Sequence, residues 1–307
     1  MGKIPESRGK KREREEEIEA GSRETDASLS FENSLTFSDT LVALRIMRAQ
    51  FPDIEKEFFH HLQVSIQPFI LRSQLYSSVK DRTQVDRELE VWFFAVENLK
   101  IFLNLELITS LAILINGSFF FLQSLKKEKL LRVFKLNTGQ DDHAIMFMDD
   151  YLNQVGLVMK RMEAKKQDAI AVFEWFKTYV IISKLEPSIE HQELCSLLSF
   201  GGKVKDEHIS LLINAGLLTR QLIDSNMYWF AIPNIGSVLK GLSQGRKELL
   251  SFLNRRKYKE MMLSSLEKKH LRMSPLDMRF HLRDLIGSGH LNTLHTPTGL
   301  VVRVCKD

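Results

Sequence analysis

The sequence DEHISLLINAGLLTRQLIDSNMYWFAI, residues 206–232, contains an amphipathic helical pattern, a glycine break and two short apolar stretches. Gly216 stands where the helical pattern ends, and glycine can adopt the left-handed conformation that closes a helix. The apolar stretches, 217–221 and 227–232, flank an Asp-Ser-Asn sequence at 224–226. Residues of these types favour tight turns between paired strands. The stretch therefore predicts a helix followed by a β-hairpin.

The same pattern occurs twice more in the chain. One copy, MRFHLRDLIGSGHLNTLHTPTGLVVRV (278–304), predicts a helix that ends near 287–289 and a hairpin that turns at 297–299. The other copy is split, because an apolar block separates DRTQVDRELE (81–90) from SLKKEKLLRVFKL (124–136). A helix that runs into a two-stranded wing is the core of a winged-helix domain. The repeat predicts tandem nucleic-acid-binding modules rather than a catalytic fold.

The predicted fold is mainly α with small β wings (α+β), in which three tandem winged-helix domains follow a disordered N-terminal tail. The tail, 1–36, carries dense charge and almost no aromatic side chains. It therefore cannot bury enough apolar surface to offset the entropy lost on ordering. The predicted domains are 37–148, interrupted by the apolar block 91–123, then 149–233, and then 234–307 with its basic helices.

The apolar block VWFFAVENLKIFLNLELITSLAILINGSFFFLQ (91–123) admits three interpretations. Its length and hydropathy suit a membrane span, but a span would interrupt a repeat whose two halves otherwise join. A soluble insertion is the second interpretation. The sequence favours the third, a translated intron: valine codons begin with the donor dinucleotide GT, Phe119–Phe121 imply a pyrimidine-rich tract, and Gln123 can be encoded by CAG. We therefore do not expect a membrane partner.

Features near the N-terminus and the cysteine content indicate the compartment. RGKKRER (8–14) resembles a basic nuclear-import signal, and a solvated charge run without a specific role is the alternative. The first thirty residues lack the apolar core of a secretory signal peptide. Cys195 and Cys305 are far apart, which fits a reducing compartment and argues against a cysteine-rich zinc site. We expect a nuclear protein.

Basic side chains are concentrated between residues 234 and 272, although the net charge of the chain is only +4. Lysine and arginine neutralise phosphates and release counterions, which gives nucleic-acid affinity that falls steeply with salt. The predicted DNA-binding residues are Lys240, Arg246, Lys247, Arg255, Arg256, Lys257, Lys259, Lys268 and Lys269. A second set flanks the predicted recognition helix of the first domain, Lys80, Arg82 and Arg87. The alternatives are a solvated basic face for the first set and capping or ion pairing for the second.

No catalytic, metal-binding or cofactor-binding residues are predicted. A protein kinase needs a glycine-rich loop, a strand lysine, a catalytic loop with aspartate and asparagine, and a DFG motif. HLRDL (281–285) resembles a catalytic loop only superficially, and the sequence contains no GxGxxG, DFG or Walker A motif. His60–His61 is an isolated pair, which is more typical of a helix surface than of a metal site.

Five segments resemble the serine/threonine-protein kinase 19 family, and the resemblance extends over about 38–304 apart from the apolar block. The segments are ILRSQLYSSVKDRTQVDR (70–87), HAIMFMDDY (143–151), LLINAGLLT (211–219), RRKYKEMMLSSL (255–266) and HLRDLIG (281–287). The resemblance implies a tandem winged-helix nuclear protein that binds duplex DNA and RNA. It also implies a role in transcription-coupled nucleotide-excision repair, with transcription and repair proteins as partners, despite the kinase name.

The resemblance also concerns individual basic residues. It implies DNA contact at Lys240, Arg255, Lys257 and Lys268, whereas Asn254 stands where the family has a basic residue. A protein-interaction scaffold that binds no nucleic acid is the alternative function. Serine/threonine kinase activity, as in the family name, is a remote one.

The intron interpretation predicts a shorter transcript. Amplification of complementary DNA across codons 90–124 is expected to give a product that lacks codons 91–123. Genomic DNA without GT at codon 91 or without AG at codon 123 would exclude this interpretation.

Overall fold

The computed structural model describes residues 39–52, 54, 66–90, 131–138, 142–164 and 171–305. The predictions for the tail, for the apolar block and for His60–His61 lie outside these residues. The described residues form helices and small antiparallel sheets, in agreement with the predicted α+β class. Three units follow one another along the chain, and each contains one sheet.

Unit 1 has a sheet whose middle strand joins segments far apart in the sequence. Ile145 of β3 lies opposite Ile70 of β1 on one side and opposite Val133 of β2 on the other. In the split copy of the repeat, residues 82–90 before the apolar block are helical. Strand β2 lies within 124–136, the segment predicted to continue that copy after the block. The elements of unit 1 are α2 (Asp39–Ala49), β1 (Ile70–Leu71), α3 (Arg72–Ser78), β2 (Leu131–Lys135) and β3 (His143–Phe147).

Unit 2 begins directly after β3. Its helix and hairpin at 206–230 match the prediction closely, and Gly216 adopts the predicted left-handed conformation with φ 78°. The helical stretch before β4 includes a π-helical turn, Phe176–Val180. The other elements are α7 (Met148–Ala164), α8 (Ala171–Trp175), α9 (Ile181–Ser183), β4 (Ser188–Glu190), α10 (His191–Ser199), α11 (Asp206–Asn214), β5 (Leu218–Arg220) and β6 (Met227–Phe230).

Unit 3 opens with the longest helix of the described residues, α12 (Gly236–Asn254). The helix and hairpin at 278–304 again agree with the prediction, and Gly289 and Gly299 have positive φ angles. The Asp277 side chain caps α14 by accepting a hydrogen bond of 2.8 Å from the Phe280 N–H. The remaining elements are β7 (Glu260–Met262), α13 (Leu263–Glu267), α14 (Met278–Gly287), β8 (Leu291–Thr296) and β9 (Gly299–Val304).

The three sheets have the same strand arrangement. Their orders are β1-β3-β2, β4-β6-β5 and β7-β9-β8, so the last strand of each unit always lies between the other two. The short first strands were not predicted, because stretches of two or three residues carry no period-2 pattern. A helix, a short strand, two helices and a two-stranded wing, in this order, is an arrangement consistent with a winged helix.

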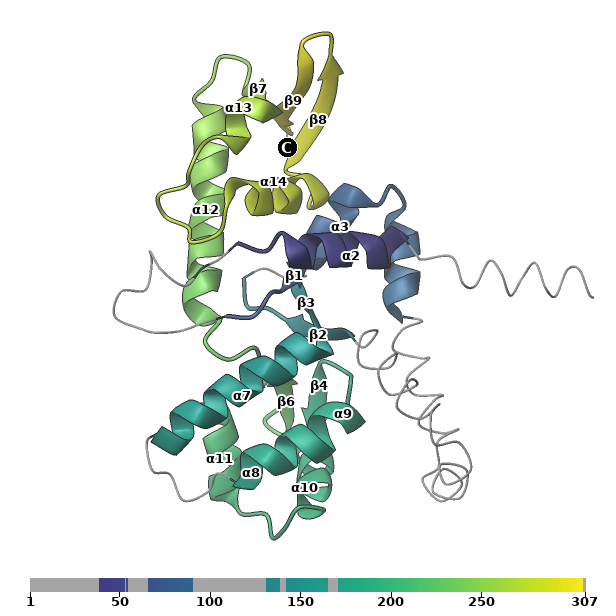
Figure 1. Cartoon of the computed structure of the whole chain (residues 1–307), viewed down its shortest axis with the longest axis vertical. Helices are drawn as coiled ribbons and strands as arrows, with labels where there is room; N and C mark the ends of the chain where they lie inside the picture. The colour runs from purple at the N-terminus through teal and green to yellow at the C-terminus, as the bar shows by residue number, and fades with distance from the viewer. Residues whose placement is uncertain are drawn as a thin grey trace, which may run out of the picture.

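The units are stacked along the long axis of the molecule (Figure 1). Unit 2 lies at one end, unit 1 in the middle and the wing of unit 3 at the other end. Helix α12 runs along one side from the junction of all three units to the far end, and α14 lies between α12 and α3. The basic helix of the sequence therefore spans much of the molecule.

One hydrophobic core passes through all three units. The largest buried cluster includes Phe134 from unit 1, Phe230 from unit 2, and Leu242 and Phe280 from unit 3. Units 1 and 3 each have a further apolar cluster of their own. Because separate domains would each bury a separate core, this shared core makes the units parts of one packed body.

Close packing between α14 and α3 depends on a glycine. A Cβ atom placed on Gly287 would lie 1.6 Å from the carbonyl oxygen of Ser73 and 2.6 Å from its carbonyl carbon. Backbone atoms on α3 cannot move away as a flexible side chain can. Gly287 is thus required for the contact of unit 3 with unit 1.

Gly287→Ala is expected to lower the free energy of unfolding by more than about 2 kcal/mol, because the added methyl group overpacks the α3–α14 contact. Urea denaturation followed by circular dichroism measures this loss. Gly156→Ala in α7 is the matched control, since nothing lies within 4 Å of its added Cβ. Equal urea midpoints for the two variants would contradict the assigned role of Gly287.

Candidate nucleic-acid interface

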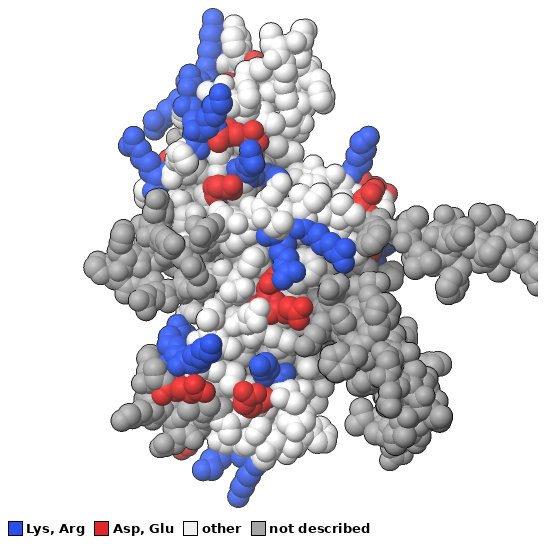
Figure 2. Space-filling model, in the orientation of Figure 1, with Lys and Arg blue, Asp and Glu red and all other residues white. Residues whose placement is uncertain are grey.

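Six of the predicted basic residues gather at the outer end of α12. We call them the basic corner: Arg255, Arg256, Lys257, Lys259, Lys268 and Lys269. All are exposed except Lys269, which is half-buried. Figure 2 shows lysine and arginine side chains concentrated over this end of the molecule. Residues 255–259 follow α12, and residues 268–269 follow α13. The chain turns back between them through β7 and α13, which brings the two groups together.

Local backbone structure holds the corner in place. Helix α12 ends at Asn254, and Lys259 takes a positive φ of 53° before β7 begins. The Lys259 carbonyl accepts a hydrogen bond of 3.0 Å from the Val304 N–H of β9. The loop is therefore tied to the wing, and its basic side chains extend from a fixed backbone.

Aromatic rings, rather than carboxylates, contact the cations of the corner. Phe252 lies between two of them, with its ring centroid 5.0 Å from Cζ of Arg256 and 5.2 Å from Nζ of Lys269. Nζ of Lys257 lies 5.3 Å from the ring centroid of Tyr258. Within the described part of the chain, none of the six residues has an ion pair. Their charges thus remain available to an external anion.

The nearby carboxylates are engaged elsewhere. Glu260 pairs with Arg303, and Glu267 lies 3.5 Å from Arg279. Glu248 accepts backbone hydrogen bonds of 3.1 Å from Arg272 and 3.0 Å from Met273. Beside the corner, a groove of about 540 Å³ is lined by Phe252, Arg255 and Lys269 among others. Two of these carboxylates are thus near arginine side chains, and Glu248, which lines the groove, is held by backbone N–H groups.

Arg246 does not belong to this surface. Its Nη1 lies 2.8 Å from Oδ2 of Asp142, and its Nε lies 2.6 Å from Oδ2 of Asp284. Burial alone would lower the pKa of Arg246, but the hydrogen bonds that Arg246 donates to Asp284 and Asp142 outweigh burial and raise it. The guanidinium is committed to two carboxylates inside the protein, so the predicted phosphate contact at Arg246 does not fit the structure. Sequence spacing could not reveal these partners, because Asp284 comes from another helix of unit 3 and Asp142 comes from unit 1.

Lys240 and Lys247 lie on α12 but apart from the basic corner. Lys240 and Arg255 are fifteen positions apart, which corresponds to a distance of about 22 Å along the helix axis at the usual helical rise. Both lysines are exposed and line a groove at the junction of the three units. The structure thus divides the predicted set into a corner, an internal arginine and a junction pair.

The second predicted set, in unit 1, is also divided. Nη2 of Arg82 donates a hydrogen bond of 2.9 Å to the Gly287 carbonyl, and its guanidinium lies 5.4 Å from the Tyr76 ring. Arg82 therefore stabilises the contact between units 1 and 3. Lys80 and Arg87 are exposed, but they do not join the basic corner.

Helices α14 and α11, which precede the wings of units 3 and 2, are poorly placed for reading bases. Seven of the ten residues of α14 are buried. The first turn of α11 carries Asp206 and Glu207, which would repel phosphates. Sequence reasoning missed two arginines on one side of α14, the exposed Arg279 and the half-buried Arg283, although their i, i+4 spacing in a predicted helix was a usable signal.

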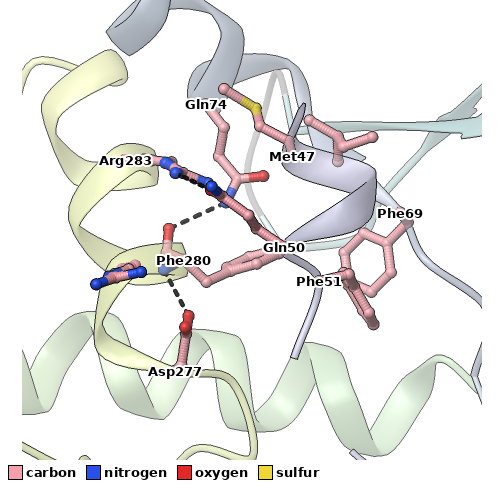
Figure 3. Close-up of a pocket in the computed structure, with 10 residues that line it drawn as sticks. Met47, Gln50, Phe51, Phe69, Gln74, Asp277, Phe280 and Arg283 are labelled. Carbon is pink, nitrogen blue, oxygen red and sulfur yellow. Dashed lines mark hydrogen bonds between the residues drawn. The ribbon is translucent and has the colours of Figure 1, made fainter. Parts of the chain in front are cut away.

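A small pocket beside these two arginines is structural (Figure 3). Phe51, Phe69 and Phe280 meet there, with ring centroids 5.3 to 6.1 Å apart. The Gln74 amide donates a hydrogen bond of 3.0 Å to the Phe280 carbonyl, and Arg283 donates to the Gln50 side chain. Its volume of about 30 Å³ corresponds to about one water molecule, so the pocket is too small for a nucleotide or a peptide side chain.

Residues of the kinase-like segment HLRDL (281–285) have a structural role. His281 and Asp284 are buried in α14. His281 Nε2 lies 2.7 Å from the Ser274 hydroxyl, and Asp284 accepts hydrogen bonds from Arg246 and, at 2.6 Å, from the Ser73 hydroxyl. Neither side chain is open to a substrate.

The described residues contain neither a metal-ligand cluster nor a helix suited to span a membrane. No group of three or more His, Cys, Asp or Glu is arranged to hold a metal ion there. Among the helices of that same part of the chain, none has both the length and the apolar character needed to cross a membrane.

Known proteins resemble this chain over most of its length. The family model described as inactive serine-threonine protein kinase 19 matches residues 121–304. The human protein named Winged helix repair factor 1 is 26% identical over 241 residues, which cover 78% of each chain. Its Dictyostelium discoideum counterpart is 29% identical over 215 residues, 59% of this chain and 54% of the relative. A Schizosaccharomyces pombe protein named Serine/threonine-protein kinase mug51 is 29% identical over 135 residues, 42% and 44% of the two chains.

Buried His281 predicts a dependence of stability on pH. Burial lowers the pKa of His281 from 6.5 to about 4, so between these values the unfolded chain binds a proton that the folded chain does not. Stability therefore falls as pH decreases from 6.5 to 4, by up to about 3 kcal/mol from this group. Urea midpoints measured across this range are expected to fall more steeply for the natural chain than for His281→Gln. Equal slopes would contradict the assignment.

Proposed function

Since this chain belongs to the family described as inactive serine-threonine protein kinase 19, we propose that it is a non-enzymatic, nuclear winged-helix repair factor that binds duplex DNA. The observation that carries the proposal is the basic corner. Six cations project there without a carboxylate partner among the described residues, and aromatic rings hold three of them. Phosphates of a nucleic-acid backbone are the anions that such a surface fits best.

Binding through phosphates explains how a winged helix with a buried third helix can act. Each lysine or arginine that neutralises a phosphate releases counterions, whichever bases are present. The Phe252 ring contacts both Arg256 and Lys269. These contacts restrict the motion of the two side chains before binding and lower the entropy cost of contacting a phosphate. The expected affinity is therefore largely independent of base sequence, and RNA, which has the same charged backbone, is a second ligand.

The domain organisation that we propose is three tandem winged-helix units. Its support is the repeated strand order, in which the last strand of every unit is central. The shared core fixes the units relative to one another. A bound duplex at the corner would thus be held in a constant orientation relative to unit 2.

The proposed cellular role is transcription-coupled nucleotide-excision repair. It is supported by relatives named as repair factors and by the basic segment 8–14, which resembles a nuclear-import signal. Transcription and repair proteins are the proposed partners. Kinase activity is not part of the proposal, because the chain lacks the kinase motifs and its HLRDL segment is buried.

A protein-interaction scaffold is the second candidate function. Leu222 and Ile223, in the turn between β5 and β6, are fully exposed. Adjacent exposed aliphatic side chains at a hairpin tip are typical of a contact with another protein. This role is compatible with DNA binding at the opposite end of the molecule, and only the absence of nucleic-acid binding would make it the sole function.

The double variant Arg255→Glu, Lys257→Glu is expected to weaken duplex DNA binding by about tenfold or more at 0.1 M salt, because two phosphate contacts become repulsions. Fluorescence anisotropy titrations at several salt concentrations measure this change. They should also give a salt slope that is smaller by about two. Lys203→Glu, an exposed residue of unit 2, is the control and is expected to bind normally. Unchanged duplex affinity in the double variant would refute DNA binding at the corner.

A further inference from the structure

A groove at the junction of the three units has the chemistry of an anion site. It has a volume of about 640 Å³ and lies between the end of β2, the sheet of unit 2 and the first turns of α12. Each unit contributes to its lining, so the site exists only in the assembled fold. Its size is in the range of pockets that hold small molecules or a few linked groups.

The charged residues among the described lining of the groove are positive. Lys135, Lys240 and Lys247 line it, and the described lining contains no aspartate or glutamate. Asp142, which accepts a hydrogen bond of 2.5 Å from lining residue Thr138, is neutralised by Arg246. Three lysines without a lining carboxylate therefore favour a ligand that carries more than one negative charge.

The positions of the lysines suit a repeating anion. Lys240 and Lys247 are seven residues apart on α12, so they lie on one side of the helix about 10 Å from each other. Lys135 approaches from unit 1, and its Nζ lies 4.9 Å from the ring centroid of Trp229 in unit 2. The positive charges thus come from two walls of the groove.

The floor of the groove is apolar. The buried Phe134 and Ile232 and the half-buried Ile235 and Leu239 line it, together with hydrogen-bonding side chains such as Asn137 and Gln244. A single-stranded nucleic acid presents bases that can enter such a floor while its phosphates contact the lysines. A duplex keeps its bases paired inside a wide cylinder, so it would touch only the rim.

We infer that this junction groove binds a single-stranded segment of nucleic acid. The inference rests on the proposed nucleic-acid function and adds to the duplex-binding corner a second site that is specific for unpaired strands. Lysines 240 and 247 neutralise phosphates, Lys135 closes the opposite wall, and the apolar floor receives a base. Helix α12 connects the two sites, because its outer end belongs to the corner and its first turns to the groove.

Two variants test the groove separately from the corner. Lys135→Glu, Lys240→Glu reverses the charge of two walls, and Ser243→Trp fills the groove without any change of charge, since Ser243 is a small lining residue. The probe is a labelled strand of mixed sequence and about 20 nucleotides, compared with the same strand annealed to its complement. Circular dichroism and urea midpoints establish that each variant is folded.

Both variants are expected to weaken single-strand binding by at least about tenfold. Ser243→Trp, which changes no charge, is expected to change duplex binding by less than about twofold. Arg255→Glu, Lys257→Glu should have the larger effect on the duplex, and Lys203→Glu should affect neither probe. Normal single-strand affinity in Ser243→Trp, or equal losses for both probes, would overturn the groove assignment while duplex binding at the corner stands. If the natural chain binds neither probe, the proposed function itself is refuted.

Discussion

Arg246 lies between Asp142 and Asp284, and this double ion pair fixes α12 and α14 against the sheet of unit 1. Asp284 is fully buried, and the Ser73 hydroxyl of α3 donates a further hydrogen bond to it. A buried carboxylate is costly unless it is paired, and removal of one partner leaves the other charge uncompensated. Segments from units 1 and 3 are therefore both needed to compensate these charges. The close contact at Gly287 lies beside them and lets α14 pack directly on α3.

A second arginine, which is fully buried, joins unit 1 to unit 2 by different chemistry. Arg132 of β2 has no carboxylate partner in the described structure. Its Cζ lies 3.8 Å from the Phe230 ring centroid, and its Nη1 donates hydrogen bonds to the carbonyls of Ile181 and Lys184. Burial lowers the pKa of Arg132 to about 10, so the side chain stays charged at neutral pH. The ring faces and carbonyl groups stabilise the cation, and this requires β2 and β6 to lie together.

These two arginines have partners within the protein, whereas other cations are left for a ligand. Arg246 and Arg132 are used inside the body, where they set the positions of the units. The cations left for a ligand lie at the outer end of α12, in unit 3, and along the junction groove, which all three units build. A rigid body of this kind holds both surfaces at a constant separation. The proposed duplex site and the proposed single-strand site are therefore at fixed positions on one molecule.

Local sequence determined those features of the protein that depend on neighbouring residues. The helix and hairpin at 206–230 and at 278–304, their glycine-closed ends and the concentration of basic residues in unit 3 follow from residue type and spacing alone. The short strands β1, β4 and β7 could not be predicted, because their pairing energy comes from a strand far away in the chain. The same holds for the role of each basic residue. Arg246 and Lys247 are adjacent in sequence, yet one is half-buried and paired with two carboxylates and the other faces solvent. Only the tertiary structure decided between them, because the partners of a charged side chain are brought to it by the folding of distant segments.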